Sequence, residues 1–249
     1  MPAGTHLTVV NGDMDVRKAE TVIDSIDLKG QLLIEASNVV VKRSLIEGRH
    51  GATSIVVVSG SNISFSDDEI NCISPATGTD DMNLMNSTVT RINAHGGVDG
   101  IKIHGTGSIS DSYIHGLSWF PHDPSHANGP THNDSIQILS ATGIRVFDNY
   151  LGSVAQDNSA IQVTQDVGTV NNLVISDNYA DGGSCTFNFS SHNSAGKRVG
   201  MSGITVTDNR FGRDSSRGCA IVRDLKTTIV ASGNVYDDNG APVVIVASN

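Results

Sequence analysis

The sequence predicts an all-β protein: a single-domain, right-handed parallel β-helix of about nine coils that spans residues 1–249. The composition favours strands and turns, with 26 Gly, 4% aromatic residues and abundant Val, Ile, Ser, Thr, Asn and Asp. An eight-residue pattern also recurs along the chain, and a second alternating apolar–polar run precedes most of its copies. These observations together indicate a stack of similar coils.

The recurring pattern has apolar residues at its first and third positions, often Asn or Ser at its sixth, and usually an apolar residue at its eighth. Its third positions are separated by 18 to 37 residues and are Ile23, Val41, Phe65, Val89, Ile109, Val146, Ile175, Val206 and Ala231. A repeat of roughly 20 to 30 residues with strand-like alternation is typical of a solenoid. The Leu/Asn ladder of leucine-rich repeats and the 3.6-residue period of helical repeats are both missing, which favours a β-solenoid.

The sixth position is expected to form a corner of the coil. It is Asn in four successive copies: Asn149, Asn178, Asn209 and Asn234. Asn tolerates left-handed backbone and can hydrogen-bond to its copy in the next coil, so a stacked Asn column is predicted.

The second run of each coil assigns side chains to two faces by its alternation. The residues expected in the core are Ile101, Ile103, Ile136, Ile138, Ile161, Val163, Phe187 and Phe189, and those expected outside, one above another, are Lys102, Gln137, Gln162 and Asn188. Cys185 and Cys219 should stack as well. We expect two buried thiols rather than a disulfide, because stacked parallel strands offer poor bridging geometry.

The longest coil carries an inserted loop at about residues 115–133, which holds the only Trp, Trp119, and four of the nine His. Trp119 and Phe120 either form a platform for a sugar ring or hold the loop down. The spacing of the loop histidines matches no zinc signature.

The outward strip beside this loop is the candidate site. Asp99 and Asp134 each lie three residues before an outward residue, so stacking brings their Cα atoms within roughly 5 Å. Carboxylates that close share a proton, recruit a cation or pair with a base; alternatively, each Asp only hydrogen-bonds its turn. The strip also contains Lys102, His104, His132, Gln137, Gln162, Gln165, Asp166 and Asn188.

The coil pattern and the segment HNDSIQI (132–138) resemble the pectate-lyase-like β-helix superfamily, and in particular the short β-helix proteins of actinobacteria and their phages. The resemblance covers essentially the whole chain, but its motif specifies fold better than activity. The superfamily includes polysaccharide lyases, glycoside hydrolases, C5-epimerases and phage tail depolymerases. The resemblance implies a carbohydrate-active protein, extracellular or virion-associated, whose partner is an acidic polysaccharide.

The leading hypothesis is a polysaccharide lyase that cleaves a uronic-acid polymer by β-elimination. Lys102 is the expected base, with His132 or His104 as acid or second base and Asp134 as a further catalytic group. The expected substrate contacts are Gln137, Gln162, Gln165, Asn188 and Trp119. Asp99, Asp134 and Asp166 either bind Ca²⁺, which prefers carboxylate oxygens, or orient the basic groups.

Two alternatives remain open at this stage. A glycoside hydrolase would use paired aspartates, Asp99 with Asp134 or Asp166. A non-catalytic glycan-binding or phage tail-type module would use the same strip only to hold a glycan.

Charge and hydropathy restrict the partners. A net charge of −10 argues against nucleic acid and acidic membranes. No apolar run approaches the roughly 20 residues that span a bilayer, and the given sequence shows no signal peptide. The stretch to about Asn11 and residues 241–249 are expected to cap the ends, either in a monomer or with end-to-end or trimeric association.

Overall fold

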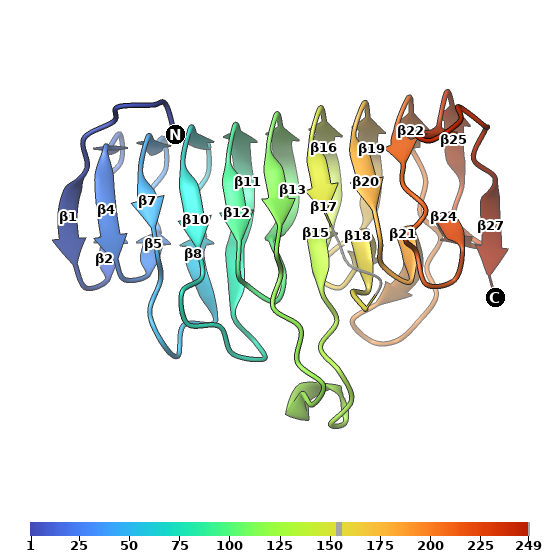
Figure 1. Cartoon of the computed structure of the whole chain (residues 1–249), viewed down its shortest axis with the longest axis horizontal. Helices are drawn as coiled ribbons and strands as arrows, with labels where there is room; N and C mark the ends of the chain where they lie inside the picture. The colour runs from blue at the N-terminus through green and yellow to red at the C-terminus, as the bar shows by residue number, and fades with distance from the viewer. Residues whose placement is uncertain (153–155, 249) are drawn as a thin grey trace.

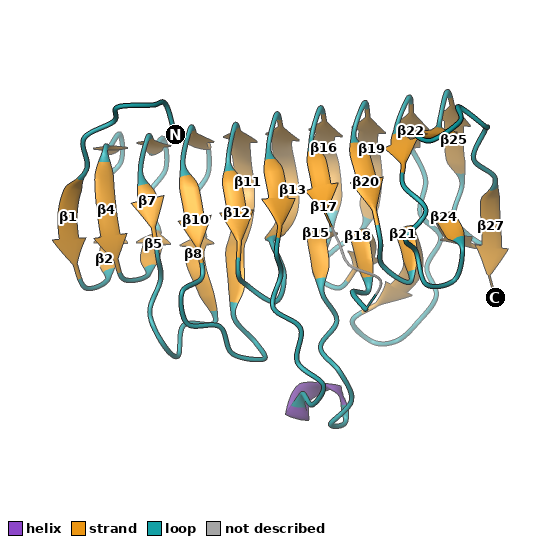
Figure 2. Ribbon diagram, in the orientation of Figure 1, coloured by secondary structure: helices purple, strands orange, loops and turns teal. Residues whose placement is uncertain are grey.

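The computed structural model describes residues 1–152 and 156–248, and this part of the chain is a right-handed parallel β-helix with its coils stacked along one axis (Figure 1). Most coils contribute to three parallel sheets. Helical structure in the described residues is limited to one 3₁₀ turn, η1 (Pro124–His126), in the inserted loop (Figure 2). None of the described helical structure is long and apolar enough to cross a membrane.

The strands of each sheet follow one another from coil to coil. The first sheet contains β1 (Thr8–Asn11), β4 (Ile26–Lys29), β7 (Leu45–Ile46), β10 (Glu69–Asn71), β12 (Asn93–His95), β14 (Tyr113–His115), β17 (Tyr150–Gly152), β20 (Tyr179–Asp181), β23 (Arg210–Phe211) and β26 (Val235–Tyr236). The second contains β2 (Met14–Val16), β5 (Leu32–Ile34), β8 (Ser54–Val58), β11 (Asp80–Thr90), β13 (Ile101–Ser110), β15 (Asp134–Ile138), β18 (Ser159–Gln165), β21 (Cys185–Asn193), β24 (Cys219–Asp224) and β27 (Ile245–Ser248). The third contains β3 (Val22–Asp24), β6 (Val40–Lys42), β9 (Ile63–Ser66), β16 (Ala141–Phe147), β19 (Val170–Ser176), β22 (Ile204–Thr207) and β25 (Ile229–Ser232), together with the second halves of β11 and β13.

The predicted repeat is confirmed in the third sheet. The nine third-position residues pair in register through all eight steps, from Ile23 to Ala231. They alternate with outward residues, and side chains such as Phe65 and Val146 are fully buried in the core between the sheets. Apolar alternation therefore sets the register along the stack.

The two ends of the chain form strands of the stack rather than separate caps. β1 pairs with β4, and β27 pairs with β24. The first and second sheets therefore each have ten strands in the described residues, one more than the predicted nine coils. The last residue of the predicted C-terminal cap, Asn249, lies outside the described residues.

The Asn corner is confirmed as a hydrogen-bonded column, but its backbone differs from the prediction. The left-handed residue is the one before each Asn, as at Asp148, Asp177 and Asp208, with φ of 56°, 59° and 57°. The backbone N and Nδ2 of Asn149 donate to Asn178 Oδ1 at 3.0 and 2.9 Å. Equivalent bonds join the next two pairs, and we call Asn149, Asn178, Asn209 and Asn234 the corner column.

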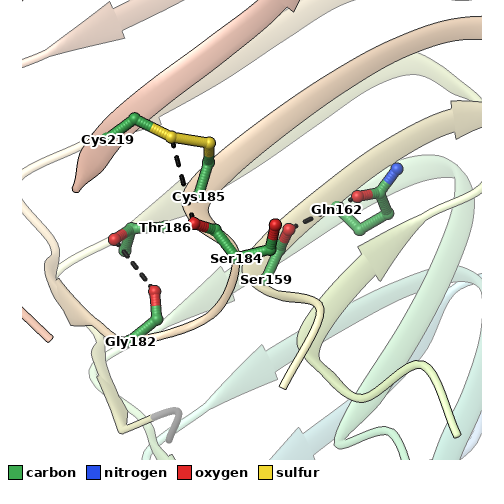
Figure 3. Close-up of a disulfide and its surroundings, with 7 residues drawn as sticks. All are labelled: Ser159, Gln162, Gly182, Ser184, Cys185, Thr186 and Cys219. Atoms are coloured by element: carbon green, nitrogen blue, oxygen red, sulfur yellow. Dashed lines mark hydrogen bonds between the residues drawn. A yellow bond between two sulfur atoms is a disulfide. The ribbon is translucent and has the colours of Figure 1, made fainter. Parts of the chain in front are cut away.

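Cys185 and Cys219 form a disulfide, so the expectation of two buried thiols is wrong (Figure 3). They are paired in register on β21 and β24, with Cα atoms 4.9 Å apart. This separation lies within the roughly 4.4–6.8 Å that disulfides span, so neighbouring parallel strands do permit a bridge. Cys72 is free and buried.

Candidate functional site

A groove runs along the outer face of the second sheet beside the inserted loop. Its floor follows the predicted ladder, because Lys102 pairs with Gln137, Gln137 with Gln162, and Gln162 with Asn188. The part nearest the loop has a volume of about 290 Å³. It is lined by Asp99, Lys102, His126, His132, Asp134, Gln137, Asn158, Gln162, Thr164 and Asp166.

Lys102 is held by two carboxylates on neighbouring coils. Its Nζ lies 2.9 Å from Asp80 Oδ2 and 3.0 Å from Asp99 Oδ2. The Lys102 side chain is 23% exposed, whereas those of Asp80 and Asp99 are 8% and 6% exposed. The ammonium is therefore the more accessible partner, and the two carboxylates are almost fully buried. Sequence reasoning missed Asp80, although Asp80-Asp81 directly precedes the alternating run Met82–Leu84 that stacks on Ile101–Ile103.

Asp80, Asp99 and Asp134 belong to three successive coils, and we call them the site column. Asp99 Oδ1 accepts a hydrogen bond of 2.7 Å from the backbone N of Asp134. Asp134 Oδ1 accepts one of 3.0 Å from Asn158 Nδ2, while its Oδ2 is buried with no hydrogen-bond partner among the described residues. Gly100 permits the close stacking, because a Cβ there would lie 2.6 Å from the carbonyl oxygen of Ser135.

Burial is the largest influence on the pKa values of the three carboxyl groups in the site column. It raises the pKa of Asp80 to about 7, and the Lys102 charge limits that rise. Burial also raises the pKa of Asp99 and of Asp134, and for Asp134 the Asp99 charge adds to the effect. Burial alone would lower the pKa of Lys102, but the charges of Asp99 and Asp80 raise it above its usual range. Lys102 is thus a stable cation, which disfavours its predicted role as the base.

His132 is one of two exposed histidines, with His126, that line this part of the groove. It is exposed, and its ring stacks on that of His126 at 4.2 Å between centroids. His126 Nδ1 lies 2.5 Å from Asp123 Oδ2, which fixes the partner ring. Burial, followed by the nearby His126, lowers the pKa of His132 below its ordinary 6.5. His132 is therefore neutral at neutral pH and able to accept a proton.

The loop that carries His132 is anchored to the coils by buried hydrogen bonds. Asn133 Nδ2 donates to the carbonyl oxygens of Val98 and Ser118, both at 2.8 Å. Thr131 Oγ1 donates to Asn133 Oδ1 at 2.7 Å. The segment HNDSIQI is therefore part of the stack through Asn133 and Asp134, and part of the groove through His132 and Gln137.

Gln165 does not belong to the groove, which corrects the prediction that it contacts substrate. It is 4% exposed, and its Nε2 donates to the carbonyl oxygens of Ser191 and Val199. Its Oε1 accepts from the backbone N of Val170. Gln165 lies two residues after the core-facing Val163, so alternation places it on the core side, and its burial agrees with that side.

The remaining predicted residues occupy different places. Asp166 and Gln137 line the groove, and Asp166 Oδ2 accepts a hydrogen bond of 2.6 Å from Thr164. Trp119 is 39% exposed on the loop but is not among the lining residues, and neither is His104. Burial lowers the pKa of His104.

The predicted Ca²⁺ site lacks a preformed cluster. In the described part of the chain, no three His, Cys, Asp or Glu side chains are arranged to hold a metal ion. Asp80 and Asp99 instead share an ammonium group. This contact matches the other expected role of the aspartates, that of orienting basic groups.

Comparison with known proteins adds little beyond this geometry. No family model matches the chain, and no curated protein matches its sequence. A solved structure with some similarity is that of QnrB1, a plasmid-mediated fluoroquinolone resistance protein, with 11% identity and a TM-score of 0.27 over 94% of this chain and 92% of that one. We draw no conclusion from so distant a similarity.

Proposed function

We propose that this protein is a polysaccharide lyase that cleaves a uronic-acid-containing polymer by β-elimination. The observation that carries the proposal is the layering of the groove. Lys102 and His132 reach its surface, whereas Asp80 and Asp99, the ion-pair partners of Lys102, are almost fully buried. The accessible groups of the groove are thus a fixed cation, Lys102, and a neutral base, His132, together with His126 and the carboxylate of Asp166.

In the proposed reaction, the Lys102 ammonium binds the uronate carboxylate and makes the proton on C5 more acidic. His132 removes that proton, and the electron pair forms a C4–C5 double bond as the C4–O bond breaks. The leaving oxygen takes up a proton from solvent. Asp80 and Asp99 position Lys102 through their ion pairs.

A glycoside hydrolase is the less favoured enzyme. It would need carboxylates that reach the glycosidic bond. Asp99 and Asp134 are only 4% and 1% exposed, and Asp134 Oδ1 is already bonded to Asn158. Asp166 is exposed in the groove but has no second accessible carboxylate beside it among the described lining residues.

The disulfide supports the expected location of such an enzyme. Disulfides persist in oxidising environments and are rare in the cytosol. The Cys185–Cys219 bridge therefore favours an extracellular or virion-associated protein acting on an external polymer.

The test is to incubate the protein with a panel of uronic-acid polymers and follow the ultraviolet absorbance of the unsaturated product. His132→Ala and Lys102→Ala should each lower turnover by about 10²- to 10⁴-fold, while His6→Ala, an exposed His outside the groove, should leave it unchanged. The rate should rise with pH through a value below 6.5, because His132 has a lowered pKa. New reducing ends without absorbance would identify a hydrolase. Glycan binding without either product would identify a binding module.

A further inference from the structure

The groove continues beyond the candidate site toward the C-terminal coils. A second cavity of about 260 Å³ shares His132, Asn158 and Gln162 with the first. Its far part is lined by Asn188, His192, Arg198 and Asp224, among others. The two cavities are therefore parts of one groove that follows the axis of the β-helix.

The far end of this groove repeats the layering found at Lys102. Arg198 lies opposite His192 in a short antiparallel hairpin, and its Nε is 3.3 Å from His192 Nε2. Its Nη1 lies 3.5 Å from Asp224 Oδ2. The Arg198 side chain is 37% exposed and that of Asp224 is 7% exposed. A partly exposed cation thus lines the groove and pairs with an almost fully buried carboxylate, as at Lys102.

Between the two cations the outward residues of the second sheet are neutral amides, and the carboxylate of Asp166 also lines the groove. Gln137, Gln162 and Asn188 stand on successive strands. The three steps from Lys102 to Asn188 span about 14 Å at about 4.8 Å per strand. A pyranose unit advances a polysaccharide by roughly one such step, so about four sugars cover the floor from Lys102 to Asn188, which lines the same cavity as Arg198.

We infer that Arg198, aided by His192, is a second carboxylate-binding subsite, so that the groove recognises a run of about four or more acidic sugars. This inference rests on the substrate class in the proposed function. Arg suits the role because its planar fork binds carboxylates through two parallel hydrogen bonds. Polymers with isolated uronates, or chains too short to reach Arg198, should bind weakly.

The experiment measures binding separately from turnover. The His132→Ala variant is titrated calorimetrically with oligogalacturonates of two to six residues, and again with Arg198→Ala added. Affinity should rise by roughly tenfold to a hundredfold when the chain reaches about four residues, since a hydrogen bond to a charged group contributes that much. Arg198→Ala should remove the rise and leave short chains unaffected, while Arg198→Lys should restore part of it. Arg145→Ala, an exposed Arg on β16 in another sheet, is the matched control.

Each outcome separates the two proposals. An unchanged affinity of longer chains in Arg198→Ala, or an equal loss for all lengths, would overturn the subsite. Equal binding of carboxyl-reduced oligomers would overturn it as well. The expected length dependence with no unsaturated product from the wild type would reject the lyase and keep the subsite. No binding of any oligogalacturonate would reject this subsite together with the substrate class on which it rests.

Discussion

Two columns of buried polar residues run along this β-helix, and they differ in how fully their polar side-chain atoms are hydrogen-bonded. The corner column is neutral, and the Oδ1 atoms of Asn178, Asn209 and Asn234 each accept two hydrogen bonds from the preceding coil. The site column consists of carboxylates with raised pKa values, and Asp134 Oδ2 has no hydrogen-bond partner among the described residues.

The difference separates a structural column from the column at the candidate site. A neutral amide column satisfies buried backbone groups and costs no charge burial. Stacked carboxylates are costly inside a protein unless a cation compensates them. In the site column that cation is Lys102, which is also the group presented to the groove. A column of stacked polar residues is thus a candidate site when its side chains are ionisable and some of their buried polar atoms lack a hydrogen-bond partner.

Removing the Lys102 ammonium should give the largest loss in the free energy of unfolding. Lys102→Met leaves Asp80 and Asp99 buried without their partner, and we expect the free energy of unfolding at pH 8 to fall by about 3–5 kcal/mol. Chemical denaturation measures this loss, which should shrink at acid pH and be partly reversed by adding Asp99→Asn. Lys42→Met, which breaks a more exposed pair with Asp24, should cost less than about 1 kcal/mol. Equal losses in both variants would show that burial does not distinguish the site column.

The second effect concerns the disulfide, which continues the site column. Ser159 pairs in register with Asp134, and Cys185 occupies the equivalent place on the next strand. The bridge links residues 34 apart in sequence, so Cys185→Ala with Cys219→Ala should lower the free energy of unfolding by about 3–4 kcal/mol. Denaturation with and without reductant checks this, since reductant should affect only the wild type. A similar effect of reductant on the double variant would assign the loss to another cause.

The third variant tests the corner column. Asn178→Ala removes the Oδ1 acceptor of two hydrogen bonds from Asn149 and the three hydrogen bonds that Asn178 Nδ2 donates. The free energy of unfolding should therefore fall by about 2–3 kcal/mol. Asp177→Asn changes the exposed left-handed neighbour to a residue that suits this backbone, and should have little effect. Catalytic turnover of folded Asn178→Ala should match the wild type. A selective loss of turnover would contradict the purely structural role of the column.

The sequence was sufficient for the register of both columns but not for all of their chemistry. Apolar alternation fixes which residues stack, and it placed Asp99 beside Asp134 and Lys102 beside Gln137. The predicted outward position of Gln165 is wrong because Gln165 shares the core-facing side of Ile161 and Val163. Sequence reasoning also missed Arg198, which lies in a hairpin outside the repeat.

Contacts between coils depend on side-chain direction and burial, and a linear pattern does not contain them. The ion pair between Lys102 and Asp80 is one example, and it changes Lys102 from an expected base into a fixed cation. The disulfide is another, because the register of Cys185 and Cys219 was predictable while their bonding was not.

The smallest predicted effect concerns Asp68, a carboxylate at a corner position. It lies in the corner one coil beyond Ser44 and accepts hydrogen bonds from the backbone N of Ser44 and of Ser66 at 2.8 and 3.0 Å. Burial raises its pKa from 3.8 to about 7. The folded state therefore holds a proton that the unfolded state releases above about pH 4, so the contribution of Asp68 to stability is complete at acid pH and is lost as pH rises toward 7.

Asp68→Asn converts this position to the residue of the corner column and removes its titration. The variant should gain about 2 kcal/mol of unfolding free energy relative to the wild type between pH 5 and pH 7, at about 1.4 kcal/mol per pH unit. Parallel denaturation curves at several pH values measure the difference, in which contributions common to both proteins cancel. A constant difference across that range would mean that Asp68 stays ionised in the fold. In that case two backbone hydrogen bonds would be enough to make a buried carboxylate tolerable, and charge alone would no longer distinguish the site column from the corner.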